Sequence, residues 1–162
     1  MFAITERVRW SDVDDASILY FGNYIRFYEI AETEWLRTYD MAYSQRTFDQ
    51  WGVYPVRRVF HCEYEQPALL DDLLRIELWT EHIGTTSYKL GFAVRRDQSG
   101  ELLAKGYCVM VTVDIQTRTP VPIPTVLRRA LEDNRRTADH PAESIGADGT
   151  PTVSEPAADS EK

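Results

Sequence analysis

The chain has 162 residues, which is enough for one domain with a substantial hydrophobic core. Hydrophobic residues make up 43% of it and aromatic residues 12%, a composition typical of folded proteins and not of disordered ones. The formal charge is −8 and no basic stripe is present, which argues against a nucleic-acid-binding protein. Residues 137–162 hold six acids and one base, so most of this charge lies in the tail and residues 1–136 are only mildly acidic.

The N-terminal segment has no feature of a signal peptide. It reaches a charged side chain at Glu6 and contains no apolar core segment. No apolar run approaches the roughly 20 residues that a membrane-spanning helix needs. Cys62 and Cys108 lie in apolar runs without metal-ligand spacing, which predicts buried, reduced thiols. We therefore expect a soluble cytoplasmic protein that uses no metal ion and no cofactor.

The first third of the chain predicts a strand and then a long helix. Residues 4–10 alternate well enough for a short strand. Between Tyr20 and Tyr39, apolar and aromatic residues recur at steps of three and four, as they do in helices. Apolar residues also occur around much of the girth, which predicts a largely enclosed helix. The polar residues that fall between the apolar ones are Arg26, Glu29, Glu32, Glu34 and Arg37.

The middle of the chain predicts a short element followed by a sheet. Residues 41–52 favour a shorter helix or a loop that ends at Gly52. Four runs rich in β-branched and aromatic residues follow, at 56–68, 73–84, 86–96 and 102–115. Strands that adjoin in sequence and are joined by tight turns pair antiparallel. We expect an α+β fold with one antiparallel sheet of about five strands, whose buried face the long helix covers.

The last part predicts a short helix and a tail. Prolines precede Thr125, which we expect to be the N-cap of a helix of about ten residues. From about Thr137 onward small residues, prolines and acids dominate, so the segment has too little apolar surface to bury. We divide the chain into a folded domain over residues 1–136 and a disordered acidic tail over residues 137–162.

Three motifs carry a resemblance to a known family. They are DVDDASILYFGNY at 12–24, YEQPALLDDLLRIE at 64–77 and AKGYCVMVTVDIQTRTPVPIP at 104–124. On the α+β pattern they resemble the hotdog-fold thioesterases, specifically the 4-hydroxybenzoyl-CoA thioesterase-like family. The resemblance covers about residues 3–134. It implies a sheet wrapped around one long central helix, and hydrolysis of an acyl thioester to free acid and thiol.

The resemblance also implies an active site. The catalytic carboxylate of the family's aspartate subgroup falls on Asp14, and the oxyanion site falls on the backbone N–H groups of Phe21 and Gly22. The chemistry is consistent, because the first N–H groups of a helix lack an intrahelical partner and favour negative charge. Asp14 would act as a nucleophile or as a general base on water, and the sequence leaves both roles open.

The neighbours of Asp14 differ in what they predict. We expect Asp12 to be structural, bracing the turn, and Asp15 to point to solvent. Ser17 stands where many relatives have glycine, and a serine would be strained there if the position needs a positive φ. An EF-hand loop starting at Asp12 would need glycine in place of Ser17 and glutamate in place of Asn23, so the spacing excludes an EF-hand.

Substrate contacts are less well specified. Aromatic residues near the start of the helix are candidates for the acyl pocket, although such residues are more often part of a core. Two arginines are candidates for CoA phosphates, although a solvated surface explains them as well. The turn at 81–88 has no arginine or lysine, which leaves an acyl carrier protein open as the donor. The substrate-binding candidates are Tyr20, Asn23, Tyr24, Glu29, Arg57 and Arg58.

Two functional hypotheses follow. The first is an acyl-CoA or acyl-carrier-protein thioesterase that acts as a homo-oligomer, since the resemblance implies an active site at a dimer interface and dimers that pair into homotetramers. The second is a non-catalytic hotdog protein that binds acyl-CoA or acts in regulation. Asp14 favours the enzyme, because a pure binder has no need of a carboxylate at that point.

Overall fold

The computed structural model describes residues 1–136, so the acidic tail predicted at 137–162 lies outside the described residues. Strands and helices follow one another in an order close to the predicted one, with short 3₁₀ turns before and at the start of the first helix. The elements are β1 (Phe2–Arg7), α1 (Tyr24–Arg37), α2 (Gln45–Trp51), β2 (Val53–Tyr64), β3 (Leu73–Ile83), β4 (Ser87–Arg96), β5 (Leu102–Asp114) and α3 (Thr125–Asp133).

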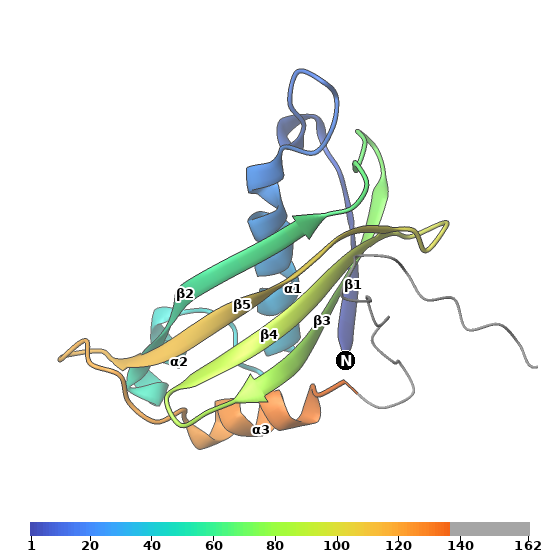
Figure 1. The fold of residues 1–162 in the computed structure, drawn as a ribbon. Coiled ribbons are helices and arrows are strands. Elements are labelled where there is room, and N and C mark those ends of the chain that lie inside the picture. Colours follow the sequence, from blue (N-terminus) through green and yellow to red (C-terminus); the bar gives the residue numbers. More distant parts are fainter. Residues whose placement is uncertain (137–162) are drawn as a thin grey trace, which may run out of the picture.

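The strands form a single five-stranded sheet in the order β1-β3-β4-β5-β2, and every neighbouring pair is antiparallel. Helix α1 lies against one face of this sheet, which confirms the predicted α+β architecture (Figure 1). Although β2 and β3 adjoin in sequence, they do not pair, and β2 pairs with β5. Residues 65–72 are too long for a tight turn. They cross from β2, at one edge of the sheet, to β3, which lies next to the opposite edge strand β1, and they run beside residues 17–19.

The core lies between α1 and the inner face of the sheet. Alternate residues of β4, at positions 88, 90, 92 and 94, are at most 2% exposed, as the period of two predicts for one sheet face. The rings of Phe60 and Phe92 stack with centroids 5.3 Å apart, and Tyr28 of α1 meets both rings. The sheet covers one side of α1 only, so Ile25 and Glu29 stay exposed where the sequence predicted a more fully enclosed helix.

Glu32 differs most from its expected place. The sequence puts it among the polar residues between the apolar ones, yet its side chain is fully buried. Its Oε2 lies 2.5 Å from Nη2 of Arg57 on β2, and the Tyr28 hydroxyl donates to its Oε1 at 3.3 Å. A buried carboxylate is stable only with such partners, and Arg57 reaches it from an element 25 residues away.

The two short helices are defined at their ends by local chemistry. The Ser44 hydroxyl accepts a hydrogen bond from the Thr47 N–H, and Gly52 ends α2 with φ +68°, so residues 45–51 are a helix and not a loop. Helix α3 begins at Thr125 itself with Pro124 in the N-cap position, so the expected capping role of Thr125 is wrong. Thr125 already has helical backbone, and no side chain caps this end.

Candidate active site

Asp14 lies in a tight hairpin that connects β1 to α1. Val13 and Leu19 form an isolated antiparallel bridge, and the Asp14 N–H donates to the Ile18 carbonyl at 2.9 Å. The Ser17 N–H donates back to the Asp14 carbonyl at 2.9 Å. This pattern is a three-residue hairpin loop, whose last loop residue normally has left-handed backbone. Ser17 has φ +61°, so the position does require a positive φ.

The Asp14 carboxylate is exposed and held from one side. Its Oδ1 accepts a hydrogen bond from the Ala16 N–H at 2.8 Å, which fixes the side chain over its own turn. The rest of the carboxylate is open to solvent, and Asp15 beside it is exposed as well. A carboxylate held in this way can approach both water and a bound thioester.

The entrance of α1 offers unpaired backbone donors. Phe21–Asn23 is a 3₁₀ turn that runs directly into α1. Among residues 1–136, the Phe21 and Gly22 N–H groups donate to no backbone or side-chain acceptor. A Cβ on Gly22 would come within 2.6 Å of the exposed Tyr20 ring, so the ring would have to move to admit a side chain there. The helix end therefore presents amide donors where an anion is favoured.

Asp14 and Phe21 line the same pocket, which has a volume of about 350 Å³. Tyr24 of α1 and Tyr64 at the end of β2 form another part of its lining, with ring centroids 5.1 Å apart in an edge-to-face arrangement. The Tyr64 hydroxyl donates to the Phe21 carbonyl at 3.2 Å, and burial raises the pKa of Tyr24 to about 12. Both phenols are therefore neutral at physiological pH. The complete lining is Asp14, Ile18, Leu19, Phe21, Tyr24, Tyr64, Glu65, Gln66 and Pro67.

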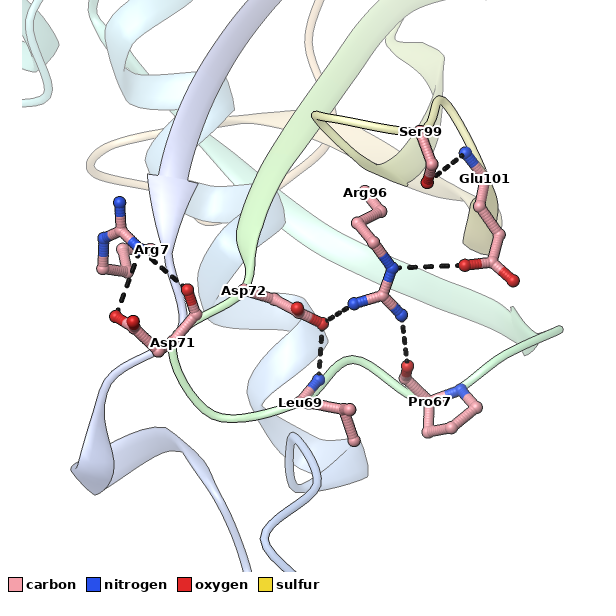
Figure 2. A network of polar contacts seen from close by, with 8 residues as sticks. All are labelled: Arg7, Pro67, Leu69, Asp71, Asp72, Arg96, Ser99 and Glu101. Carbon is pink, nitrogen blue, oxygen red and sulfur yellow. Dashed lines mark hydrogen bonds and ion pairs between the residues drawn. The ribbon is translucent and has the colours of Figure 1, made fainter.

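Arg96 fixes the loop that carries Pro67, one of the lining residues of this pocket, and Figure 2 shows the contacts of Arg96. Its Nη1 pairs with Oδ2 of Asp72, and its Nη2 donates to the Pro67 carbonyl at 3.2 Å. The same Asp72 oxygen accepts the Leu69 N–H at 2.7 Å. The loop fixed in this way meets the hairpin, because the Leu19 N–H donates to the Ala68 carbonyl at 2.8 Å.

Most of the predicted substrate-binding residues do not line this pocket. Tyr24 belongs to the lining, whereas Glu29, Arg57 and Arg58 do not. Arg57 is occupied by Glu32, and Arg58 is exposed at a β-bulge of β2.

Among residues 1–136, no group of three or more His, Cys, Asp or Glu side chains is placed to hold a metal ion. No helix in this part of the chain is long and apolar enough to cross a membrane.

The chain matches a known protein family over most of its length. The family model described as the thioesterase-like superfamily matches residues 8–131. The chain belongs to this superfamily. This thioesterase-like protein is 33% identical over 125 residues to the acyl-CoA thioester hydrolase YbgC of Escherichia coli, covering 76% of this chain and 90% of that protein. It is 29% identical over 130 residues to the acyl-CoA thioesterase YbgC of Haemophilus influenzae, covering 80% and 93% respectively.

Solved structures confirm the hotdog fold of this thioesterase-like protein. A 1,4-dihydroxy-2-naphthoyl-CoA thioesterase from Synechocystis matches it with a TM-score of 0.76 at 21% identity, covering 86% of this chain and 98% of that one. The resemblance drawn from the three sequence motifs is thus confirmed. Tyr64 and Pro67 were not predicted as pocket residues. The only signal for them in the sequence is that both stand in the second motif.

Proposed function

We propose that this chain hydrolyses acyl-CoA thioesters to the free acid and CoA. Asp14 is the nucleophile or general base, and the Phe21 and Gly22 amides are the oxyanion site. One observation carries the assignment: Asp14 and Phe21, which lie on different elements, line one pocket at the N-terminal end of α1. Membership of the thioesterase-like superfamily, and relatives named as acyl-CoA thioesterases, support the same reaction.

The geometry suits thioester chemistry. Attack on the carbonyl carbon places a negative charge on its oxygen, and free amides at a helix N-terminus stabilise that charge. One such donor contributes about 3–4 kcal/mol of transition-state stabilisation in enzymes of this kind. The attacking oxygen comes either from Asp14, giving a mixed anhydride that water then hydrolyses, or from a water molecule whose proton Asp14 takes. In both routes the carbon–sulfur bond breaks and CoA leaves as the thiolate.

The first test is free-thiol release from short, long and aromatic acyl-CoAs by the wild type and by Asp14→Asn. The amide oxygen of asparagine still accepts the Ala16 N–H, so the hairpin keeps its shape. We expect kcat/KM to fall by about 100-fold or more, with the melting temperature unchanged. Asp15→Asn is the matched control and keeps its activity.

Three results bear on the assignment. Full activity of Asp14→Asn would contradict the role of Asp14. Turnover restricted to acyl-carrier-protein esters would correct the donor. Binding of acyl-CoA without any turnover would favour the non-catalytic alternative.

We also propose that the chain acts as a homodimer formed along β2. In the described part of the chain this strand pairs only with β5, so its other edge is unpaired over a 12-residue strand. Such an edge is a template for pairing with another strand. Phe21 and Tyr64, at the pocket, are 62% and 51% exposed, which is more than large aromatic residues usually show. Sedimentation equilibrium should give at least twice the 18.7 kDa of one chain, and an 18.7 kDa species alone would contradict the dimer.

A further inference from the structure

Asp12 is a buried charge next to the proposed active site. It is 3% exposed, and its carboxylate accepts two hydrogen bonds. The Arg9 N–H donates to Oδ2 at 2.8 Å, and Nη1 of Arg26 on α1 donates to Oδ1 at 2.9 Å. When one partner of such a desolvated, paired carboxylate is removed, the folded protein loses much of its stability. The pair therefore ties the segment before the hairpin to the first turns of α1.

The backbone carbonyl of Asp12 makes a second connection between the same two segments. It accepts the Tyr20 N–H at 2.9 Å and Nδ2 of Asn23 at 2.9 Å. Asp12 stands two residues before Asp14, while Tyr20 and Asn23 flank Phe21 and Gly22. Each bond thus joins a neighbour of the proposed carboxylate to a neighbour of the proposed oxyanion amides.

We propose that Asp12, Asn23 and Arg26, which we term the Asp12 clamp, are positioning residues that hold Asp14 in register with the Phe21 and Gly22 amides. This inference rests on the proposed function. Attack and oxyanion stabilisation must occur on one carbonyl group at once, so the two parts of the site have to keep a fixed separation. The hairpin and the helix end belong to different elements, and the clamp links them by two side-chain hydrogen bonds, each of 2.9 Å.

The clamp assigns Asn23 a role different from the substrate contact predicted from sequence. Its side-chain amide is occupied by the Asp12 carbonyl, and Asn23 is not part of the pocket lining. Loss of a substrate contact would chiefly raise KM. Loss of a positioning contact lowers kcat and leaves KM nearly constant, because the misplaced groups act in the transition state.

The experiment measures kcat and KM for thiol release by Asn23→Ala and Asn23→Asp. Alanine removes the donor, and aspartate keeps the size of the side chain but places an acceptor opposite the Asp12 carbonyl. We expect kcat to fall by about 10- to 100-fold in both, with KM within about two-fold of wild type. Ser44→Ala, which removes the N-cap of α2 on another part of the fold, is the stability-matched control and keeps its kcat.

A second pair of variants tests the clamp from Arg26, whose side chain is 46% exposed, and circular dichroism establishes that each variant is folded. Arg26→Ala should lower kcat by about 10-fold, and Arg26→Lys, which keeps a cation for Asp12, should restore most of it. Arg37→Ala is the control on the same helix, because among residues 1–136 Arg37 pairs only with the partly exposed Glu34.

The outcomes separate the clamp from the proposed function. If wild type releases thiol, Asp14→Asn does not, and Asn23→Ala and Arg26→Ala keep kcat within about two-fold, the clamp is overturned while the proposed function stands. A rise in KM of about 10-fold at constant kcat in Asn23→Ala would also overturn it, in favour of a substrate contact. Absence of thiol release by the wild type would overturn the proposed function, and the clamp with it.

Discussion

Ser17 occupies a backbone position that suits glycine. With φ +61°, it closes the hairpin that carries Asp14, and its carbonyl accepts the Leu70 N–H at 3.2 Å. A non-glycine residue in the left-handed region carries a conformational cost that glycine does not. Ser17 therefore carries this conformational cost while its own carbonyl bonds to the loop at 65–72.

We predict that Ser17→Gly raises the free energy of unfolding by about 1 kcal/mol, because it relieves this strain and leaves both backbone hydrogen bonds intact. Urea denaturation of the two proteins measures the difference. Ala16→Gly in the same hairpin is the control, and it should lower stability by about 0.5–1 kcal/mol through added chain entropy alone. A Ser17→Gly variant less stable than wild type would contradict the prediction.

Helix α1 and strand β2 are joined by the buried pair of Glu32 and Arg57. Burial raises the pKa of the Glu32 carboxyl to about 7, and the guanidinium of Arg57 lowers it by a smaller amount. The phenols of Tyr28, Tyr43 and Tyr88 surround the pair, and burial raises the pKa of each well above its ordinary value. Glu32 is therefore the group in this cluster that changes charge near neutral pH.

We predict that stability falls as the pH rises across this range. Between the ordinary pKa of 4.5 and about 7, folded Glu32 keeps a proton that the unfolded chain has lost. Its contribution is fully present below pH 4.5 and is lost as the pH passes about 7, a decrease on the order of 1–3 kcal/mol. Urea denaturation across this range should show the slope in wild type and in Glu34→Gln, a control on the same helix whose carboxylate pairs with Arg37. Glu32→Gln should flatten it, and an unchanged slope in that variant would refute the assignment.

The described residues end with a segment that lies along the edge of the sheet. The Thr80 N–H donates to the Asn134 carbonyl at 2.9 Å, Arg135 forms a parallel bridge with Thr80, and the Arg136 guanidinium lies 4.8 Å from the centroid of the Trp79 ring. These contacts cover the part of β3 that extends beyond β1. The domain boundary at residue 136 stays a prediction.

We predict that a chain ending after Thr137 keeps both its free energy of unfolding and its kcat, since the removed residues are mostly small residues, prolines and acids with little apolar surface to bury. A chain ending after Asp133 should be less stable by about 1–3 kcal/mol, because it leaves the Thr80 amide and the Trp79 ring uncovered. Thermal unfolding and thiol release by the two truncated proteins provide the comparison. Loss of folding or activity in the longer one would place the domain boundary further along the chain.

Local patterns in the sequence were sufficient for most elements and for the hotdog family. Helical periodicity, strand alternation and turn residues act over a few positions, so they revealed α1, β3, β4 and β5 without knowledge of their neighbours. The motif around Asp14 likewise indicated a carboxylate beside a helix entrance. The structure was needed wherever distant residues meet: β2 beside β5, Arg57 on Glu32, Tyr64 against Phe21, and Asn23 on the carbonyl of Asp12. Those contacts follow from long-range packing and hydrogen bonding, for which single-sequence periodicity carries no signal.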